Sequence, residues 1–188
     1  MNLLEIILIG VGLSMDAFAV SITNGLSCKN LKKIQMLAVA VCFGVFQGLM
    51  PAIGFFLGKA FEGYIRAFDH WIALALLGYI GGKMIWDALK GGEEASEYTL
   101  TAKLLLMQGI ATSIDALAVG VSFAALPDVN ILTAALLICA ETFVFSFIGV
   151  AFGKRAGQKL GSRAQLIGGL ILVGIGIKIF VEHVFFGG

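Results

Sequence analysis

Two similar stretches of the chain each place an aspartate in an otherwise apolar segment. Asp16 lies within Ser-Met-Asp-Ala-Phe-Ala-Val at 14–20, and Asp115 lies within Ser-Ile-Asp-Ala-Leu-Ala-Val at 113–119. An ionised side chain near the middle of a bilayer costs between about 2.5 and more than 10 kcal/mol, so a membrane protein that keeps two of them has a use for them. This aspartate pair is the first place to expect function.

The composition decides the environment of the aspartates. Of the 188 residues, 59% are hydrophobic and 13% are charged, and the mean hydropathy is +0.98. A water-soluble domain of this size would lack polar surface, so we predict an all-α integral membrane protein with a single membrane domain over residues 1–188. Six apolar runs have the length of about 20 residues that is needed to cross about 30 Å of hydrocarbon. They cover residues 2–24, 35–58, 70–90, 101–124, 130–152 and 164–186.

The two halves of the chain resemble each other beyond the aspartates. An offset of 99 residues superposes Gly10 on Gly109 and residues 14–20 on residues 113–119, and an offset of 95 superposes residues 53–59 on residues 148–154. We therefore predict two repeats of three transmembrane helices, one over residues 1–90 and one over residues 101–188. Because three is odd, the second repeat is inverted in the membrane, a plan that puts the substrate site of secondary transporters near mid-membrane between the repeats.

Basic residues collect in alternate loops. One set of loops holds nine Lys and Arg side chains and the other set holds two. By the positive-inside rule, the first set faces the cytoplasm, which puts both termini on the outer side of a bacterial cytoplasmic membrane. These runs have neither a Gly-rich phosphate loop nor interleaved aromatic residues, so we expect no nucleic-acid partner. The larger set is Lys29, Lys32, Lys33, Lys90, Lys103, Lys154, Arg155, Lys159 and Arg163, and the smaller set is Lys59 and Arg66.

Two further polar side chains lie at the depth of the aspartates. At a rise of about 1.5 Å per residue, Gln47 is close to the middle of the second run and Glu141 is at the middle of the fifth. Pro51 cannot donate the backbone hydrogen bond that the carbonyl of Gln47 would accept, which frees an oxygen at this depth. We predict that Asp16, Asp115, Gln47 and Glu141 are metal ligands. An ordinary proline kink at Gln47, and a proton carrier or a neutral buried carboxyl at Glu141, stay open as alternatives.

Helical spacing surrounds each aspartate with small and hydroxyl-bearing residues, which we expect to support the metal ligands. The positions at minus four, plus three and plus seven are Gly12, Ala19 and Thr23 around Asp16, and Ala111, Ala118 and Ser122 around Asp115. The expected supporting residues are Ser14, Thr23, Ser113, Ser122 and Met15. Stripes of small residues also fit helix packing alone, within the chain or in a homodimer, and that interpretation stays open.

These oxygen donors suit a hard or borderline divalent cation, because carboxylate, carbonyl and water ligands fit Mg²⁺, Ca²⁺ and Mn²⁺ and two carboxylates balance the 2+ charge. The three cysteines, Cys28, Cys42 and Cys139, lack the spacing of zinc ligands. The chain also lacks a Walker motif, which disfavours direct use of ATP. Two other interpretations stay open: an intramembrane aspartic protease, whose two carboxyls share a proton, and an exporter of amino acids or another small cation.

The chain resembles one known family over essentially its whole length. The segments that carry the resemblance are 12–19, Phe-Gly at 43–44 with Pro51 and Gly54, 81–85, 111–120 and the Gly-rich stretch 168–176. Together they resemble the MntP-type bacterial manganese efflux pumps, which are related to the LysE group of exporters. The resemblance implies export of Mn²⁺ from the cytoplasm, with Asp16 and Asp115 as metal-site candidates. Gln47 departs from the pattern, because some members carry an acidic residue there, and Glu141 then compensates for the missing charge.

These observations together predict a transporter and not an enzyme. We expect alternating access, in which cytoplasmic Mn²⁺ is captured between Asp16 and Asp115 and released outward. A carboxylate that binds metal and proton in turn couples the two by competition, so we expect protons as the counter-ion. Mn²⁺ is then the transported substrate, other divalent cations are further candidates, and no cofactor is expected.

Overall fold

A computed structural model of the chain describes residues 3–28, 31–60, 100–124, 126 and 129–160, with single residues within 78–86 and 167–181. The predicted spans at 70–90 and 164–186 lie almost entirely outside these described residues. The count of six helices and the bounds of the two repeats therefore stay predictions.

The four long described regions are helical, and none of their residues forms a strand. The helices are α1 (Leu3–Ser27), α2 (Lys33–Ala60), α4 (Ala102–Thr112), α5 (Ile114–Ala124) and α6 (Ile131–Leu160). Four segments are long and apolar enough to cross a membrane, namely Leu3–Ser27, Lys33–Lys59, Ala102–Ala124 and Ile131–Ala156. This confirms the predicted helical membrane class and the first, second, fourth and fifth apolar runs.

Polar side chains form hydrogen bonds at the N-terminal ends of three of these helices. The Thr101 side chain accepts a hydrogen bond from the Leu104 N–H at 3.2 Å at the start of α4, and the Asn130 side chain accepts one from the Thr133 N–H at 3.2 Å at the start of α6. At the start of α2, the Gln35 side chain reaches back to the N–H of Lys32 at 2.9 Å. These contacts satisfy amide groups that a helix start leaves without partners.

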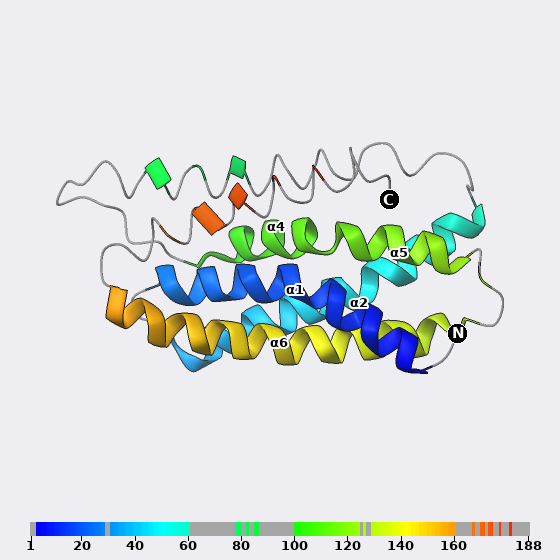
Figure 1. Ribbon diagram of the computed structural model, residues 1–188, viewed down its shortest axis with the longest axis horizontal. Helices are drawn as coiled ribbons and strands as arrows, with labels where there is room; N and C mark the ends of the chain where they lie inside the picture. The colour runs from blue at the N-terminus through cyan, green and yellow to red at the C-terminus, as the bar shows by residue number, and fades with distance from the viewer. Residues whose placement is uncertain are drawn as a thin grey trace.

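Helices α1 and α6 lie side by side and run in the same direction (Figure 1). Early in α1, the space beside Gly10 is filled by Ile138 and Glu141 of α6, and late in α1 the backbone of Ile22 fills the space beside Gly153. Because neither glycine has a side chain, the two helices approach closely along the whole seam. Helix α6 extends to Leu160, eight residues beyond the predicted end at 152, and Gly153 and Lys154, just past that end, still pack against α1.

Helix α2 and the α4–α5 pair also run parallel to each other, in the opposite direction to α1 and α6 (Figure 1). Phe46 of α2 fills the space beside Gly109 of α4, and the backbone of Pro51 lies against Gly120 of α5. Helix α2 continues through Pro51 without a break. Three Gly-xxx-Gly pairs, at 44/48, 54/58 and 149/153, face other helices of the same chain, so helix packing accounts for them.

The fourth apolar run is two helices and not the single one that we predicted over 101–124. Helix α4 ends at Thr112, α5 begins at Ile114, and Ser113 between them has φ −113° and ψ 9°. The Ser113 hydroxyl donates to the carbonyls of Gly109 at 2.7 Å and Ile110 at 3.2 Å, and its N–H also bonds to Ile110. These local bonds compete with the regular helical hydrogen bonds, and hydropathy carries no signal of them.

Candidate functional site

The two aspartates occupy different kinds of position. Asp16 lies in the middle of the continuous helix α1, whereas Asp115 lies in the first turn of α5, two residues after the break at Ser113. Both side chains are half-buried. A helix start carries partial positive charge, which favours an ionised carboxylate there. The break therefore places Asp115 where its negative charge is stabilised within a predicted span.

The break also changes the backbone hydrogen bonds around Asp115. In an uninterrupted helix the N–H of Ala116 would donate to the carbonyl of Thr112. Here it donates to Oδ1 of Asp115 at 2.8 Å. The carbonyl of Thr112 loses that donor, and broken helices of this kind supply backbone oxygens to cations in transporters.

Gln47 is fully buried and ties α2 to α1. Its Nε2 donates to the carbonyl of Leu13 at 2.7 Å, and Leu13 is three residues before Asp16. Its Oε1 is buried and accepts no hydrogen bond from any described residue. An amide oxygen without a donor is costly in a protein interior, so this atom is suited to a ligand or a water molecule.

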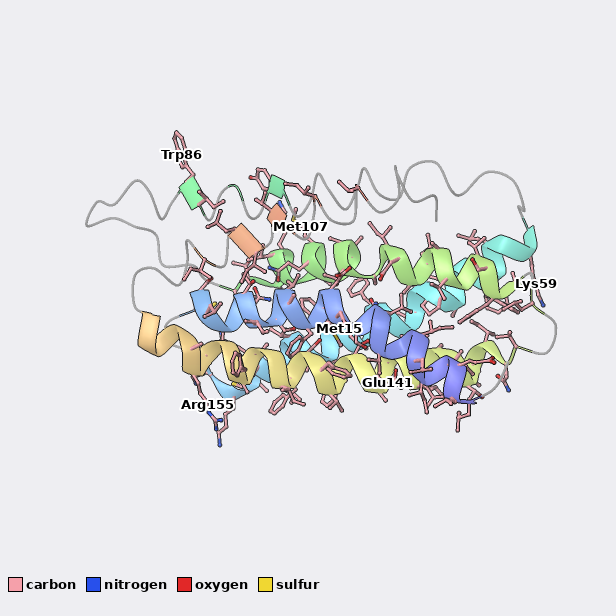
Figure 2. All side chains as sticks on the ribbon, viewed as in Figure 1. Met15, Lys59, Trp86, Met107, Glu141 and Arg155 are labelled. Atoms are coloured by element: carbon pink, nitrogen blue, oxygen red, sulfur yellow. The ribbon has the colours of Figure 1, made fainter. Side chains whose placement is uncertain are left out.

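Glu141 projects from α6 onto α1 (Figure 2). Its carboxyl occupies the space beside Gly10 that a side chain would fill, and its Oε2 is buried with no hydrogen-bond partner among the described residues. The neighbouring Thr142 lies 3.0 Å from the hydroxyl of Ser14, which itself donates to the carbonyl of Gly10 at 2.6 Å. Because Ser14 has a single hydroxyl hydrogen, Thr142 is the donor of the pair.

The predicted supporting residues bond mainly to their own helices. The hydroxyl groups of Thr23 and Ser122 donate to carbonyls four residues earlier, at 3.1 and 3.2 Å, and Ser113 does the same at the break. Met15 is 39% exposed and Ser122 is also exposed. The structure thus brings Ser14, with Gln47 and Glu141, onto one stretch of α1, and it places Ser113 beside Asp115.

Contacts of α2 connect the surroundings of the two aspartates. Gly109 and Gly120, on either side of Asp115, lie against Phe46 and Pro51, and Gln47 between these α2 residues bonds to the turn of α1 that precedes Asp16. The described residues contain no group of three His, Cys, Asp or Glu side chains placed to hold a metal ion. The predicted ligand set of Asp16, Asp115, Gln47 and Glu141 therefore stays a prediction.

Several buried polar residues were not predicted from the sequence. Asn24 of α1 and Gln108 of α4 are fully buried and bond to each other through their side-chain amides. Gln108 lies seven residues, or about two helical turns, before Asp115, and this spacing was the available signal. The other missed residues are Ser21, Thr142 and Ser146, all fully buried.

Comparison with known proteins finds relatives that match this chain over nearly its whole length. A family model described as "Putative manganese efflux pump" matches residues 29–180. A Ruminiclostridium cellulolyticum protein named "Putative manganese efflux pump MntP" is 54% identical over 190 residues, which cover 100% of both chains. A Clostridium botulinum (strain Loch Maree) protein of the same name is 50% identical over 97% of this chain and 96% of its own. A Wolinella succinogenes protein named "Putative manganese efflux pump MntP 1" is 47% identical over 98% of this chain and all of its own. No solved structure matches the chain.

Proposed function

The chain belongs to the MntP family of manganese efflux pumps, and we propose that it exports Mn²⁺ from the cytoplasm by alternating access. Membership makes the chain a transporter and not an enzyme, which sets aside the aspartic protease interpretation. Its helices make it a multi-pass membrane protein. We place it in the bacterial cytoplasmic membrane with both termini outside, on the distribution of its Lys and Arg residues.

Matching helix contacts support an inverted repeat. The offset of 99 residues relates Gly10 of α1 to Gly109 of α4, and the offset of 95 relates Phe46 of α2 to Glu141 of α6. In the structure Gly10 meets Glu141, and Gly109 meets Phe46. The α1–α6 contact therefore has a counterpart in the contact between α4 and α2.

The same correspondence holds further along the helices. Gly149 meets Phe18, and its counterpart Gly54 meets Leu117, which is 99 residues after Phe18. Gly153 likewise meets Ile22, and its counterpart Gly58 meets Val121. Because α1 and α4–α5 run in opposite directions, these contacts support our proposal that the two halves are related by an inversion of the kind found in secondary transporters.

We place the Mn²⁺ site between Asp16 and Asp115, one from each repeat. The two carboxylates balance the 2+ charge, and the carbonyl of Thr112 beside Asp115 and the buried Oε1 of Gln47 near Asp16 are further oxygen donors. Glu141, the fourth predicted ligand, meets Gly10 on a different face of α1, and we do not include it in this site. Rocking of the repeats would open the site first to the cytoplasm and then outward, with protons as the counter-ion.

The observation that carries this proposal is Asp115 at a helix break inside a membrane span of a family of manganese efflux pumps. Uptake of ⁵⁴Mn²⁺ into everted membrane vesicles tests it, because export from the cell becomes uptake in this orientation. We expect the wild-type chain to accumulate Mn²⁺ and Asp16→Ala and Asp115→Ala to lose at least about tenfold of the rate. Glu5→Ala is the matched control, because Glu5 is an exposed acid on the same helix as Asp16.

Two results would contradict the proposal. Unchanged Mn²⁺ uptake by Asp115→Ala would mean that Asp115 is not part of the Mn²⁺ site. Uptake of labelled lysine in place of Mn²⁺ would favour the alternative of an amino-acid exporter. Competition by Fe²⁺, Cd²⁺ or Mg²⁺ in the same vesicles measures which other divalent cations are substrates.

A further inference from the structure

Helix α1 presents two different polar faces. At about 100° per residue, Ser14, Ala17 and Ser21 lie within about 40° of Gly10 around the helix, whereas Asp16 lies about 120° away. Ser14, Ala17 and Ser21 are fully buried, and Asp16 is half-buried. The face of α1 that meets Glu141 is therefore not the face that carries Asp16.

Glu141 lies where the neutral form of its carboxyl is favoured over the ionised form in this conformation. Its Oε2 is buried against Gly10 and has no donor among the described residues. An ionised carboxylate oxygen without a donor in a membrane interior is far more costly than a neutral carboxyl. Nor do the described acids form a three-residue group in which Glu141 would share a metal with both aspartates.

Buried hydroxyl groups continue from Glu141 along the α1–α6 seam. Thr142 and Ser14 bond to each other at 3.0 Å. Ser146 follows one turn later on α6, and Ser21 follows on α1, where it lies against Gly149. Both are fully buried, and the Oγ atoms of Ser146 and Ser21 have no partner among the described residues. Unpaired buried hydroxyls along one line are suited to bridging water molecules and to proton relay.

We infer that Glu141 is the proton-carrying residue of the exporter and that Ser14, Thr142, Ser146 and Ser21 form its path toward the end of the bundle where α1 ends. This inference rests on the proposed Mn²⁺ export. Glu141 binds a proton from the outer side when the metal leaves outward, and releases it along the hydroxyl path to the cytoplasm before the next Mn²⁺ binds. Metal and proton then occupy separate carboxyls, and the conformational change couples them.

Few other groups could carry this proton on the three helices that meet here. Besides Glu141, the titratable side chains described on α1, α2 and α6 are Glu5, Asp16, Lys33, Cys42, Lys59, Cys139, Lys154 and Arg155. Glu5 and Lys33 are exposed at helix starts, and Lys59 and Arg155 lie at opposite ends of the bundle (Figure 2). Lys154 donates to the carbonyl of Leu31. Asp16 is the proposed metal ligand, which leaves Glu141 as the membrane carboxyl available for protons.

Two assays on the full chain in proteoliposomes separate proton carrying from metal binding. Exchange of ⁵⁴Mn²⁺ for unlabelled Mn²⁺ at equal pH needs the metal site but no net proton movement. Accumulation of Mn²⁺ driven by an imposed pH gradient needs both. We expect Glu141→Gln to keep the exchange rate within about twofold and to lose at least about tenfold of the gradient-driven rate. Glu141→Asp, which retains a carboxyl, should restore part of the gradient-driven rate, and Ser146→Ala should lower it several-fold.

Four other outcomes would contradict either this inference or the proposed function on which it rests. Loss of exchange together with gradient-driven transport in Glu141→Gln, in protein whose melting temperature matches wild type, makes Glu141 a metal ligand and overturns the inference. Gradient-driven transport at the wild-type rate in both Glu141→Gln and Ser146→Ala also overturns it. A wild-type protein that exchanges Mn²⁺ without any response to pH overturns this inference but leaves the proposed export standing. A wild-type protein that moves no Mn²⁺ in either assay contradicts the proposed function itself.

Discussion

Asn24 of α1 and Gln108 of α4 form a reciprocal amide pair. Asn24 Nδ2 donates to Gln108 Oε1 at 2.8 Å, and Gln108 Nε2 donates to Asn24 Oδ1 at 3.1 Å. Both side chains are fully buried, and 84 residues separate them along the chain. The pair joins a helix of the first half to a helix of the second half, where a polar partner is the only alternative to an unsatisfied amide in an apolar interior.

A double-mutant cycle measures this pair. We expect Asn24→Leu and Gln108→Leu each to lower the free energy of unfolding in detergent by about 1–3 kcal/mol, because each removes both hydrogen bonds of the buried pair. The double variant should lose less than the sum, with a coupling energy of about 0.5–2 kcal/mol. Additive effects of the two substitutions would mean that the pair contributes no net interaction.

The lengths of the apolar runs were enough to predict the long helices. The apolar runs at 2–24 and 35–58 became α1 and α2 with ends shifted by one to three residues. The break at Ser113 was not predicted, because the hydrogen bonds that accompany it leave the apolar pattern unchanged. The Asn24–Gln108 pair was missed because a contact across 84 residues depends on helix packing. The depth of Gln47 and Glu141 could be predicted from helical rise, but the face of α1 that each one meets could not.

Cys28, just after α1, should be an unreactive thiol. Burial raises its pKa from 9.0 to about 11, and a backbone hydrogen bond from Leu100 opposes this only in part. A rise from 9.0 to about 11 lowers the thiolate fraction near pH 8 by about 100-fold. Since the folded pKa is the higher one, the stabilising contribution of the neutral thiol is complete below pH 9.0 and is lost as the pH rises through about 11.

Alkylation in a Cys42→Ala, Cys139→Ala background, where Cys28 is the single thiol, measures this reactivity. The rate at pH 8 should be about 100-fold below that of the same chain unfolded in denaturant. Equal rates in the folded and unfolded chain would contradict the burial of Cys28.

Gly120 should tolerate no side chain. The carbonyl, Cα and C atoms of Pro51 occupy the space that a Cβ would need, and backbone atoms cannot rotate away. Gly120→Ala should therefore lower the free energy of unfolding by about 1–3 kcal/mol. Gly12→Ala is the control, because no atom lies within 4 Å of a Cβ there, and it should be neutral or stabilising by up to about 1 kcal/mol. Equal melting temperatures of the two variants would contradict the close contact of α2 and α5.

Gly10→Ala should affect function more than stability. The atoms that a Cβ would meet include the end of the Glu141 side chain, which can rotate away at small cost. We expect a loss of stability below about 1 kcal/mol but a several-fold loss of transport driven by a pH gradient, because Glu141 leaves its place on the hydroxyl seam. Melting temperature and proteoliposome transport measure the two effects. Gradient-driven transport at the wild-type rate would mean that the placement of Glu141 against α1 has no part in proton movement.

Ser113→Ala should impair transport by repairing the broken helix. Without the hydroxyl bonds to Gly109 and Ile110, the chain can restore regular helical hydrogen bonds across residue 113, including that from the Ala116 N–H to the carbonyl of Thr112. Asp115 would then leave the start of a helix, where its charge is stabilised, and an oxygen near the metal would be withdrawn. We expect Mn²⁺ uptake in everted vesicles to fall several-fold while the melting temperature is retained or raised. Ser122→Ala is the matched control. Ser122 was expected to support the metal ligands, but it is an exposed serine of α5 that donates to its own helix, so this variant should transport at the wild-type rate. If Ser113→Ala also transports at the wild-type rate, the break is a packing feature of α4 and α5 and plays no part in holding the cation.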